Sequence, residues 1–413
     1  MQRALVVALS IAIYGTAAWA FATRSAGVDF SRWPADRTVR RFWFGWLVFL
    51  FALSPLTFHA GDMRVWVEAM QGAVRGEPFA PTYVYLPIYA QVLGALLLPF
   101  AVVGVATPLV CLYVVHIPIF AAYLYCAKLM AEMIPRHADV APLAIVLAPV
   151  TIFYIFFGTN HIVMLACLLV ALRMMQLGRS LGSGLFAGLA CYKFLLVPTI
   201  FVLAVVTIRT AGWRRSRLFI AGALASLVPS VVYYGANSDY LVRTLRSGGG
   251  MGGHSHHIEP FHAFYRLRDI AGFEDWYVGR RVWLYAAIAG ALVSAVLYLS
   301  RRLNALQSLG VSAGVVALVS VEPFRMEPTI GLLWMDAVER RDLRLQTAVL
   351  VVVFTHAAAW FYPARPNILA FYEPAVRLFD MNGTAVGLAL AYLLVVTLLH
   401  GSRDGLLSST DGR

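Results

Sequence analysis

Long apolar stretches follow one another along almost the whole chain and constrain its fold more than any other feature of the sequence. Most approach about 20 residues, the length of an α-helix that crosses a lipid bilayer. A shorter stretch, 328–338, is long enough only to dip into a membrane. The sequence therefore predicts an all-α fold, a polytopic bundle of transmembrane helices with about 11–13 membrane segments, some broken or half-helices. The long stretches are residues 4–22, 42–58, 87–107, 108–127, 141–157, 162–177, 184–207, 218–235, 282–300, 305–320, 345–361 and 384–400.

The composition supports this prediction. Hydrophobic residues make up 60% of the chain and charged residues 13%, with a mean hydropathy of +0.74, whereas a soluble domain carries about 25% charged residues. The cysteines Cys111, Cys126, Cys167 and Cys191 all lie within apolar stretches. Neither a disulfide framework nor a metal site is therefore expected, and no cofactor is predicted.

The net charge of +12 is carried by short clusters of arginine between the apolar stretches. A surface that binds nucleic acid would instead combine a basic groove with interleaved aromatic residues, so we do not expect nucleic acid as a partner. Membrane proteins place arginine-rich loops on the cytoplasmic side, where anionic lipids lie. The charge therefore predicts contact with membrane lipids.

The same clusters predict a topology. Residues 4–22 end at Ala20-Phe21-Ala22, which resembles a signal-peptidase site, but the arginines that follow favour a retained helix with its N-terminus outside. Strict alternation of spans then puts the clusters 209–217, 301–302 and 340–344 inside, provided that the stretch 328–338 returns the chain inward. The loops expected outside are residues 59–86, 236–281 and 362–383.

This topology divides the chain into three parts. Residues 1–235 form an N-terminal membrane half with the first outer loop, 236–281 a flexible outer loop rich in glycine and histidine, and 282–413 a C-terminal membrane half. Between residues 128 and 184 a second arrangement stays open, because half-helices there would move the 158–161 turn to the other face.

Asp62, in the first outer loop, is the main candidate for catalysis. It directly follows a predicted transmembrane segment, and Met63, Trp66 and Met70 recur after it at helical spacing. One face of a short helix is thus expected to lie on the membrane. A carboxylate at the interface is placed to deprotonate a hydroxyl group. The alternative is that Asp62 only caps the helix, since Asp is a preferred N-cap residue.

Lys193 is the second candidate. The chain has two lysines, Lys128 and Lys193, among 33 Lys and Arg residues, and Lys193 lies inside the apolar stretch 184–207. A charge near the bilayer centre costs about 2.5–3.5 kcal/mol, so a cation there needs a partner such as an anionic head group. The alternative is that its side chain extends to the membrane surface.

Two polar turns offer further binding groups. Asn160 and His161 lie in a turn able to hydrogen-bond a polar ligand, although a helix cap by Asn160 explains the turn equally well. Arg325 has the planar guanidinium that suits a phosphate group, or it pairs with the neighbouring Glu322 or Glu327.

The loop 248–262 combines glycines with four histidines, His254, His256, His257 and His262. The spacing of these histidines matches no defined zinc pattern. We therefore expect a mobile loop that closes over a substrate, with a solvated loop without function as the alternative, and no bound metal.

In their order along the chain, these motifs resemble the GT-C superfamily of membrane glycosyltransferases, most closely glycosyltransferase family 87. That family includes polyprenyl-phosphate-mannose-dependent mannosyltransferases, among them actinobacterial phosphatidylinositol-mannoside enzymes. The sequence departs from the family at Leu86-Pro87, where two prolines often follow the tyrosine, and Asp62 lacks the second adjacent acid of some relatives. The matching segments, within roughly residues 42–210, are Gly61-Asp62 with Trp66, Tyr83-Val-Tyr85-Leu-Pro87, Gly158-Thr-Asn160, Gly178-Arg179 and Gly184 to Lys193.

The resemblance implies a cell-membrane enzyme with an outward-facing site, which moves a sugar, most simply mannose, from a polyprenyl-phosphate donor to a lipid or glycan acceptor with inversion. Asp62 is then the general base, and Lys193, with Arg325 or His161, binds the departing lipid phosphate. The remaining candidates for substrate binding are Asn160, Tyr85, Arg64 and His257.

Two other classes stay open: a transporter or flippase of a lipid-linked or polar substrate, and a non-catalytic membrane subunit of a glycan-assembly complex. A transporter requires polar residues that continue to the cytoplasmic face. Few such residues occur in the inner halves of the apolar stretches, which favours the enzyme.

Overall fold

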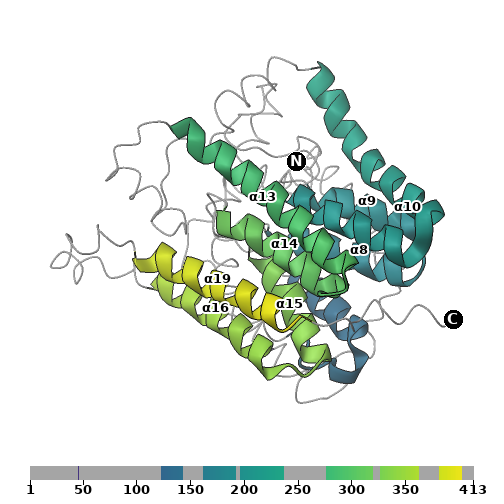
Figure 1. The fold of residues 1–413 in the computed structure, drawn as a ribbon. Coiled ribbons are helices and arrows are strands. Elements are labelled where there is room, and N and C mark those ends of the chain that lie inside the picture. The colour runs from purple at the N-terminus through teal and green to yellow at the C-terminus, as the bar shows by residue number, and fades with distance from the viewer. Residues whose placement is uncertain are drawn as a thin grey trace, which may run out of the picture. The chain divides into compact units, whose positions relative to one another are not determined.

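The computed structural model describes residues 45, 122–142, 161–191, 196–236, 276–319, 326–361 and 381–401 (Figure 1). Within these ranges the elements are helical and no strand occurs, which confirms the all-α prediction. Residues 122–133 are helical, and the elements that follow are η1 Pro135–His137, α8 His161–Gln176, α9 Ser180–Ala190, α10 Val197–Ala236, α13 Trp276–Leu299, α14 Ala305–Val319, α15 Glu327–Glu339, α16 Leu343–Phe361 and α19 Met381–Leu399.

The helices follow the predicted apolar stretches closely, and the stretch 184–207 is one of the broken ones. The stretch 184–207 is not one helix, because α9 ends at Ala190 and α10 begins at Val197. Pro198 lies in the first turn of α10, where a proline gives up no intrahelical hydrogen bond. Lys193 falls in the sequence interval between the two helices, outside the described residues.

α10 contains a kink within the arginine cluster 209–217. Gly212 has φ 76° and ψ 168°, values outside the helical range that glycine adopts readily. Among the described residues, Val197–Val228 is the one helix with the length and hydropathy of a membrane crossing, and Gly212 divides it into two segments. The shorter apolar helices are Ile162–Gln176, Ser180–Ala190, Tyr285–Leu299, Ala305–Leu318, Leu343–Thr355 and Val386–Leu399.

The chain divides into two compact units. The first comprises Met1–Glu132, Tyr154–Phe194 and Arg217–Gly252, and the second Met133–Phe153, Leu195–Ser216 and Gly253–Arg413. In the first unit, α8 and α9 pack antiparallel around the tight turn at Gly178, which has φ 72°. The Ser183 hydroxyl donates a hydrogen bond to the Ala171 carbonyl at 2.8 Å and fixes their register.

α9 and the second half of α10 approach until their backbones touch. A Cβ atom added at Gly184 would overlap the Phe219 carbonyl, and one added at Gly222 would overlap the Leu181 carbonyl. A Cβ atom added at Gly188 would overlap the Ser226 hydroxyl and crowd the Ala223 carbonyl. Small residues at such spacing allow close helix packing in membranes.

Replacing Gly184 with valine should separate α9 from α10 and lower stability. Inserting bulk into such a contact costs roughly 1–3 kcal/mol, so the thermal unfolding midpoint of the purified protein should fall. Gly45 has open space around its Cβ position, so Gly45→Val is the matched control and should unfold like the wild type. Equal midpoints for all three proteins would show that the close approach of the two helices is absent.

In the second unit, α14 and α15 form an antiparallel hairpin that is covered by the neighbouring helices α13, α16 and α19. Every residue from Glu327 to Val338 is buried. Gly310 packs against Leu333, and Gly314 against Thr329 and Leu394. Leu303 and Val311 join Leu394 in the core between α14 and α19.

The covering helices, by contrast, expose apolar side chains. Tyr285, Leu292 and Val296 of α13 are 65%, 50% and 62% exposed and recur at helical spacing. Leu388 and Tyr392 of α19 are 66% and 48% exposed. The second unit therefore exposes rows of apolar side chains on its covering helices in addition to burying an apolar core.

Contacts within each unit bear on the alternation of spans expected between residues 128 and 184. That pattern puts 128–140 and 340–344 on opposite faces, yet η1 packs on α15, and Trp334 Nε1 donates to the Val140 carbonyl at 3.2 Å. It also puts the first residues of α9 and Arg217 on opposite faces. However, α9 runs parallel to the second half of α10, since Gly184 lies beside Phe219 and Gly188 beside Ala223.

The alternative with half-helices agrees with these contacts. Because α8 is antiparallel to α9, the His161 end of α8 and Arg217 lie at opposite ends of the first unit. The 158–161 turn precedes α8 directly in the sequence.

Candidate functional site

The predicted site residues lie almost entirely outside the described part of the chain. His161 is the first residue of α8, and its backbone alone is described. Their proposed roles therefore stay predictions. The other predicted residues, all outside the described ranges, are Asp62, Arg64, Tyr85, Asn160, Lys193, His257 and Arg325.

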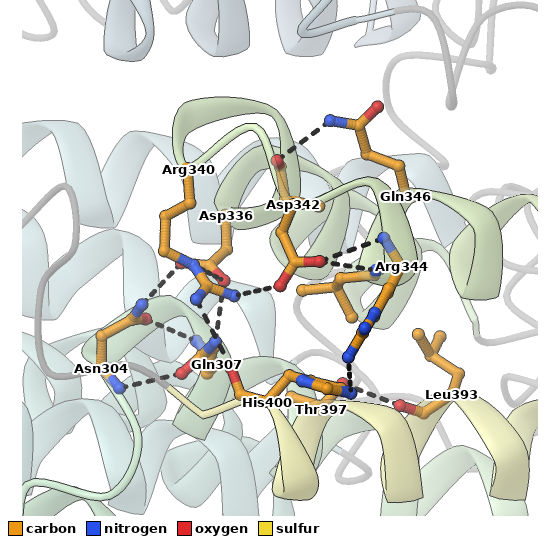
Figure 2. A network of polar contacts seen from close by, with 12 residues as sticks. Asn304, Gln307, Asp336, Arg340, Asp342, Arg344, Gln346, Leu393, Thr397 and His400 are labelled. Atoms are coloured by element: carbon orange, nitrogen blue, oxygen red, sulfur yellow. Dashed lines mark hydrogen bonds and ion pairs between the residues drawn. The ribbon is translucent and has the colours of Figure 1, made fainter.

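The described residues instead reveal a buried polar cluster in the second unit, here called the Asp336 network: Asn304, Gln307, Asp336, Arg340 and Asp342 (Figure 2). It starts at the N-terminus of α14. The Gln307 N–H donates to Asn304 Oδ1 at 3.0 Å, and the Asn304 N–H donates to Gln307 Oε1 at 3.2 Å. This is a reciprocal capping box, which satisfies two backbone donors at the helix start.

Asp336 lies at the centre of the network and is 1% exposed. Its Oδ1 accepts a hydrogen bond from Asn304 Nδ2 at 2.6 Å, and its Oδ2 accepts from Gln307 Nε2 at 2.9 Å and from Arg340 Nε at 3.0 Å.

Arg340 and Asp342 extend the network to two more helix ends. Arg340 contacts Asp342 Oδ2 at 3.3 Å and donates to the His400 carbonyl, at the end of α19, at 3.4 Å. Asp342 Oδ1 accepts from the N–H groups of Arg344 and Leu345, at 3.1 Å each, and so caps α16. The network thus joins the ends of α14, α15, α16 and α19.

The geometry suits a structural role better than a chemical one. Both Asp336 oxygens are hydrogen-bonded and shielded from solvent, so this carboxylate cannot reach a substrate. Sequence reasoning used the 340–344 cluster only as a charge signal. The capping pattern from Asn304 to Gln307 and the spacing of Asp336 and Arg340 at i,i+4 were signals for the network.

Four exposed arginines, here called the basic rim, surround the network: Arg301, Arg302, Arg341 and Arg344. Gly401 packs against the Arg302 backbone, Arg344 Nη1 lies 3.5 Å from His400 Nε2, and Arg341 Nε donates to His137 Nε2 at 3.4 Å. These contacts bring the rim together at one end of the second unit.

Two rim arginines have unusual backbones. Arg301 has φ 60° and Arg341 φ 54°, each just after a helix that ends in a Schellman pattern. Gly178 has the same position after α8. Glycine is the usual residue there, and a side chain in this conformation costs about 1–2 kcal/mol.

Two further observations concern charged and metal-binding groups. In the helix 122–133, the buried Lys128 pairs with Glu132 at 3.1 Å. Within the described ranges, no group of three or more His, Cys, Asp or Glu side chains is arranged to hold a metal ion. The histidines of the 248–262 loop lie outside those ranges.

Comparison with protein-family models found no match, and searches of the curated proteins and of the solved structures likewise found none.

Proposed function

We propose that the chain is a polytopic membrane glycosyltransferase of the GT-C type, which moves a sugar, mannose as the first choice, from a polyprenyl-phosphate donor to a lipid or glycan acceptor outside the cell membrane. The observation that carries the membrane part is the apolar exterior of α13 and α19, with Tyr285 and Leu388 about two-thirds exposed, at 65% and 66%. Contiguous apolar surface of this kind is rare on soluble monomers. The transfer reaction follows from the motif order between residues 42 and 210.

The direction of the helices supports an outward-facing site. With the arginine clusters inside, the His161 end of α8 faces outward, because Arg217 lies at the opposite end of the first unit. Asn160 and His161 then share a face with the predicted position of Asp62. A lipid-phosphate donor suits such a site, since its chain stays in the bilayer while its head group reaches the interface.

In this mechanism Asp62 removes the proton of the acceptor hydroxyl, whose oxygen attacks the anomeric carbon with inversion. The bond to the donor phosphate breaks, and Lys193, with Arg325 or His161, binds the negative charge that develops on that phosphate. Tyr85, Arg64 and His257 are the candidates for contacts with the sugar and the acceptor. No metal or other cofactor takes part in this scheme.

A panel of polyprenyl-phosphate sugars supplied to membranes containing the protein tests the reaction. We expect transfer from one donor, with none from nucleotide sugars alone. Movement of a lipid-linked sugar across the membrane without transfer would instead establish the flippase. A transporter needs an open polar path, whereas Asn304, Gln307 and Asp336 bond to one another.

The topology makes a separate prediction. η1 lies at the end of the second unit that carries 340–344. For the loop 59–86 to lie outside, residues 87–133 must then cross the membrane an odd number of times. One of the stretches 87–107 and 108–127 is therefore expected not to cross fully.

Single-cysteine labelling in a cysteine-free background tests on which face of the membrane the loop 59–86 and the arginine cluster 209–217 lie. A cysteine at position 72 should react with an impermeant reagent in intact cells, and one replacing Arg214 only after lysis. Reaction of position 72 only after lysis would place the loop 59–86 inside and remove the basis for a lipid-phosphate donor.

A further inference from the structure

The positive charge of the basic rim is not neutralised by the acidic side chains near it. The acids nearest in the network, Asp336 and Asp342, both pair with Arg340. Among the described residues, no carboxylate forms an ion pair with Arg301, Arg302, Arg341 or Arg344. Glu339 is the remaining acid of the 339–344 turn, so the rim keeps a positive excess.

The rim also adjoins exposed apolar side chains. Leu299 precedes the first pair of arginines and is 53% exposed, while Leu343, directly before Arg344, is 73% exposed. Leu399, at the end of α19, is 75% exposed. A partner that satisfies both features carries a negative head and an apolar tail.

Two of these arginines hold backbone conformations that glycine would adopt without strain. The turn after α8 has Gly178 at the equivalent position, with φ 72°, whereas the turns after α13 and α15 have Arg301 and Arg341. Residues kept in strained conformations often serve function rather than stability. Replacing either arginine with glycine would relieve the backbone strain but would also remove the positive charge at that position.

We propose that the basic rim binds the phosphate of an anionic phospholipid, with Arg301 and Arg341 as its principal donors. The planar guanidinium of each arginine pairs with two phosphate oxygens. Leu299 and Leu343 contact the adjoining acyl region, and the Asp336 network holds the helix ends that present the arginines. The site rests on the proposed membrane placement and is independent of the proposed sugar transfer.

The test compares the thermal unfolding midpoint of the full chain in lipid nanodiscs of phosphatidylcholine with the midpoint in nanodiscs that also contain phosphatidylglycerol. Three double variants separate charge from backbone strain: Arg301→Lys with Arg341→Lys, Arg301→Gln with Arg341→Gln, and Arg301→Gly with Arg341→Gly. Phosphatidylglycerol should raise the midpoint of the wild type and the Lys pair by about 2–4 °C. For the Gln and Gly pairs, phosphatidylglycerol should raise the midpoint by less than half of the wild-type shift.

In phosphatidylcholine alone, the Gly pair should unfold at a higher temperature than the Gln pair, because both lack the charge and only Gln keeps the strain. A full phosphatidylglycerol shift in the Gln pair would overturn the site. A Gly pair no more stable than the Gln pair would overturn the argument from strain. Inorganic phosphate, added to phosphatidylcholine discs, should leave the wild-type midpoint unchanged, and a shift equal to that of the lipid would overturn the lipid as ligand.

Discussion

Asp62→Asn should lower turnover by about 10²–10⁴-fold, the usual contribution of a general base, while leaving expression and donor binding intact. The asparagine keeps the size of the side chain and an oxygen able to cap a helix, but it has no basicity. Initial rates of sugar transfer, measured together with donor affinity for the purified protein, give the result. A fall in turnover without weaker donor binding is the signature of a lost base.

Glu68→Gln provides the matched control, since Glu68 is another acid of the same loop with no assigned role. It should retain nearly full turnover. If Asp62 only caps a helix, Asn should replace it with little loss, because both residues are good N-caps. Near-normal turnover in a well-expressed Asp62→Asn protein would remove Asp62 from the mechanism and favour a transporter.

Asp336→Asn should be the most destabilising of the small substitutions in the second unit. Asp336 accepts from Asn304, Gln307 and Arg340, and the new amide nitrogen would face one of these donors. Removing one partner of a buried ion pair typically costs about 3–5 kcal/mol. We expect a lower unfolding midpoint and reduced yield, measured by thermal unfolding of the purified protein.

Asp342→Asn is the control for this substitution, because it removes the same charge from the same network at a half-buried position. Asn still caps α16 through its side-chain oxygen, and the lost contact to Arg340 is a long one, at 3.3 Å. A loss of at most about 1 kcal/mol is expected. Equal destabilisation by both substitutions would show that burial of Asp336 does not determine the importance of the network.

Hydrophobic patterning was sufficient to predict the helices of the second unit, because a long apolar run has few alternatives to a helix. α13 and α19 end within one residue of the predicted stretches 282–300 and 384–400. Pro198 indicated a break in the stretch 184–207, but the pattern could not predict that α9 already ends at Ala190, since the residues on either side of the break are apolar.

Direction and pairing of helices were harder to predict. The parallel packing of α9 on α10 depends on glycines such as Gly184 and Gly222, which let the two backbones approach because they have no side chain. A hydropathy scale does not report this property. The Asp336 network joins Asn304 to Asp336, 32 positions apart, and Arg340 to His400, 60 positions apart. Its local capping and i,i+4 patterns were visible in the sequence, but the contacts between them were not. The candidate catalytic residues lie outside the described ranges, and Asp62 and Lys193 stay predictions.

The burial of α15 has a consequence for how the chain is made. This helix spans 13 residues and is enclosed by protein along nearly its whole length, so it offers little that would hold it in a bilayer by itself. Its enclosure depends on α19, which supplies Leu394 beside Gly314 and the His400 carbonyl for Arg340. Because α19 follows α14 and α15 in the sequence, the ribosome completes this cover only after it has made the hairpin. The hairpin therefore cannot reach its final packing until α19 has been synthesised, and we expect this part of the chain to assemble as a group of helices rather than one helix at a time.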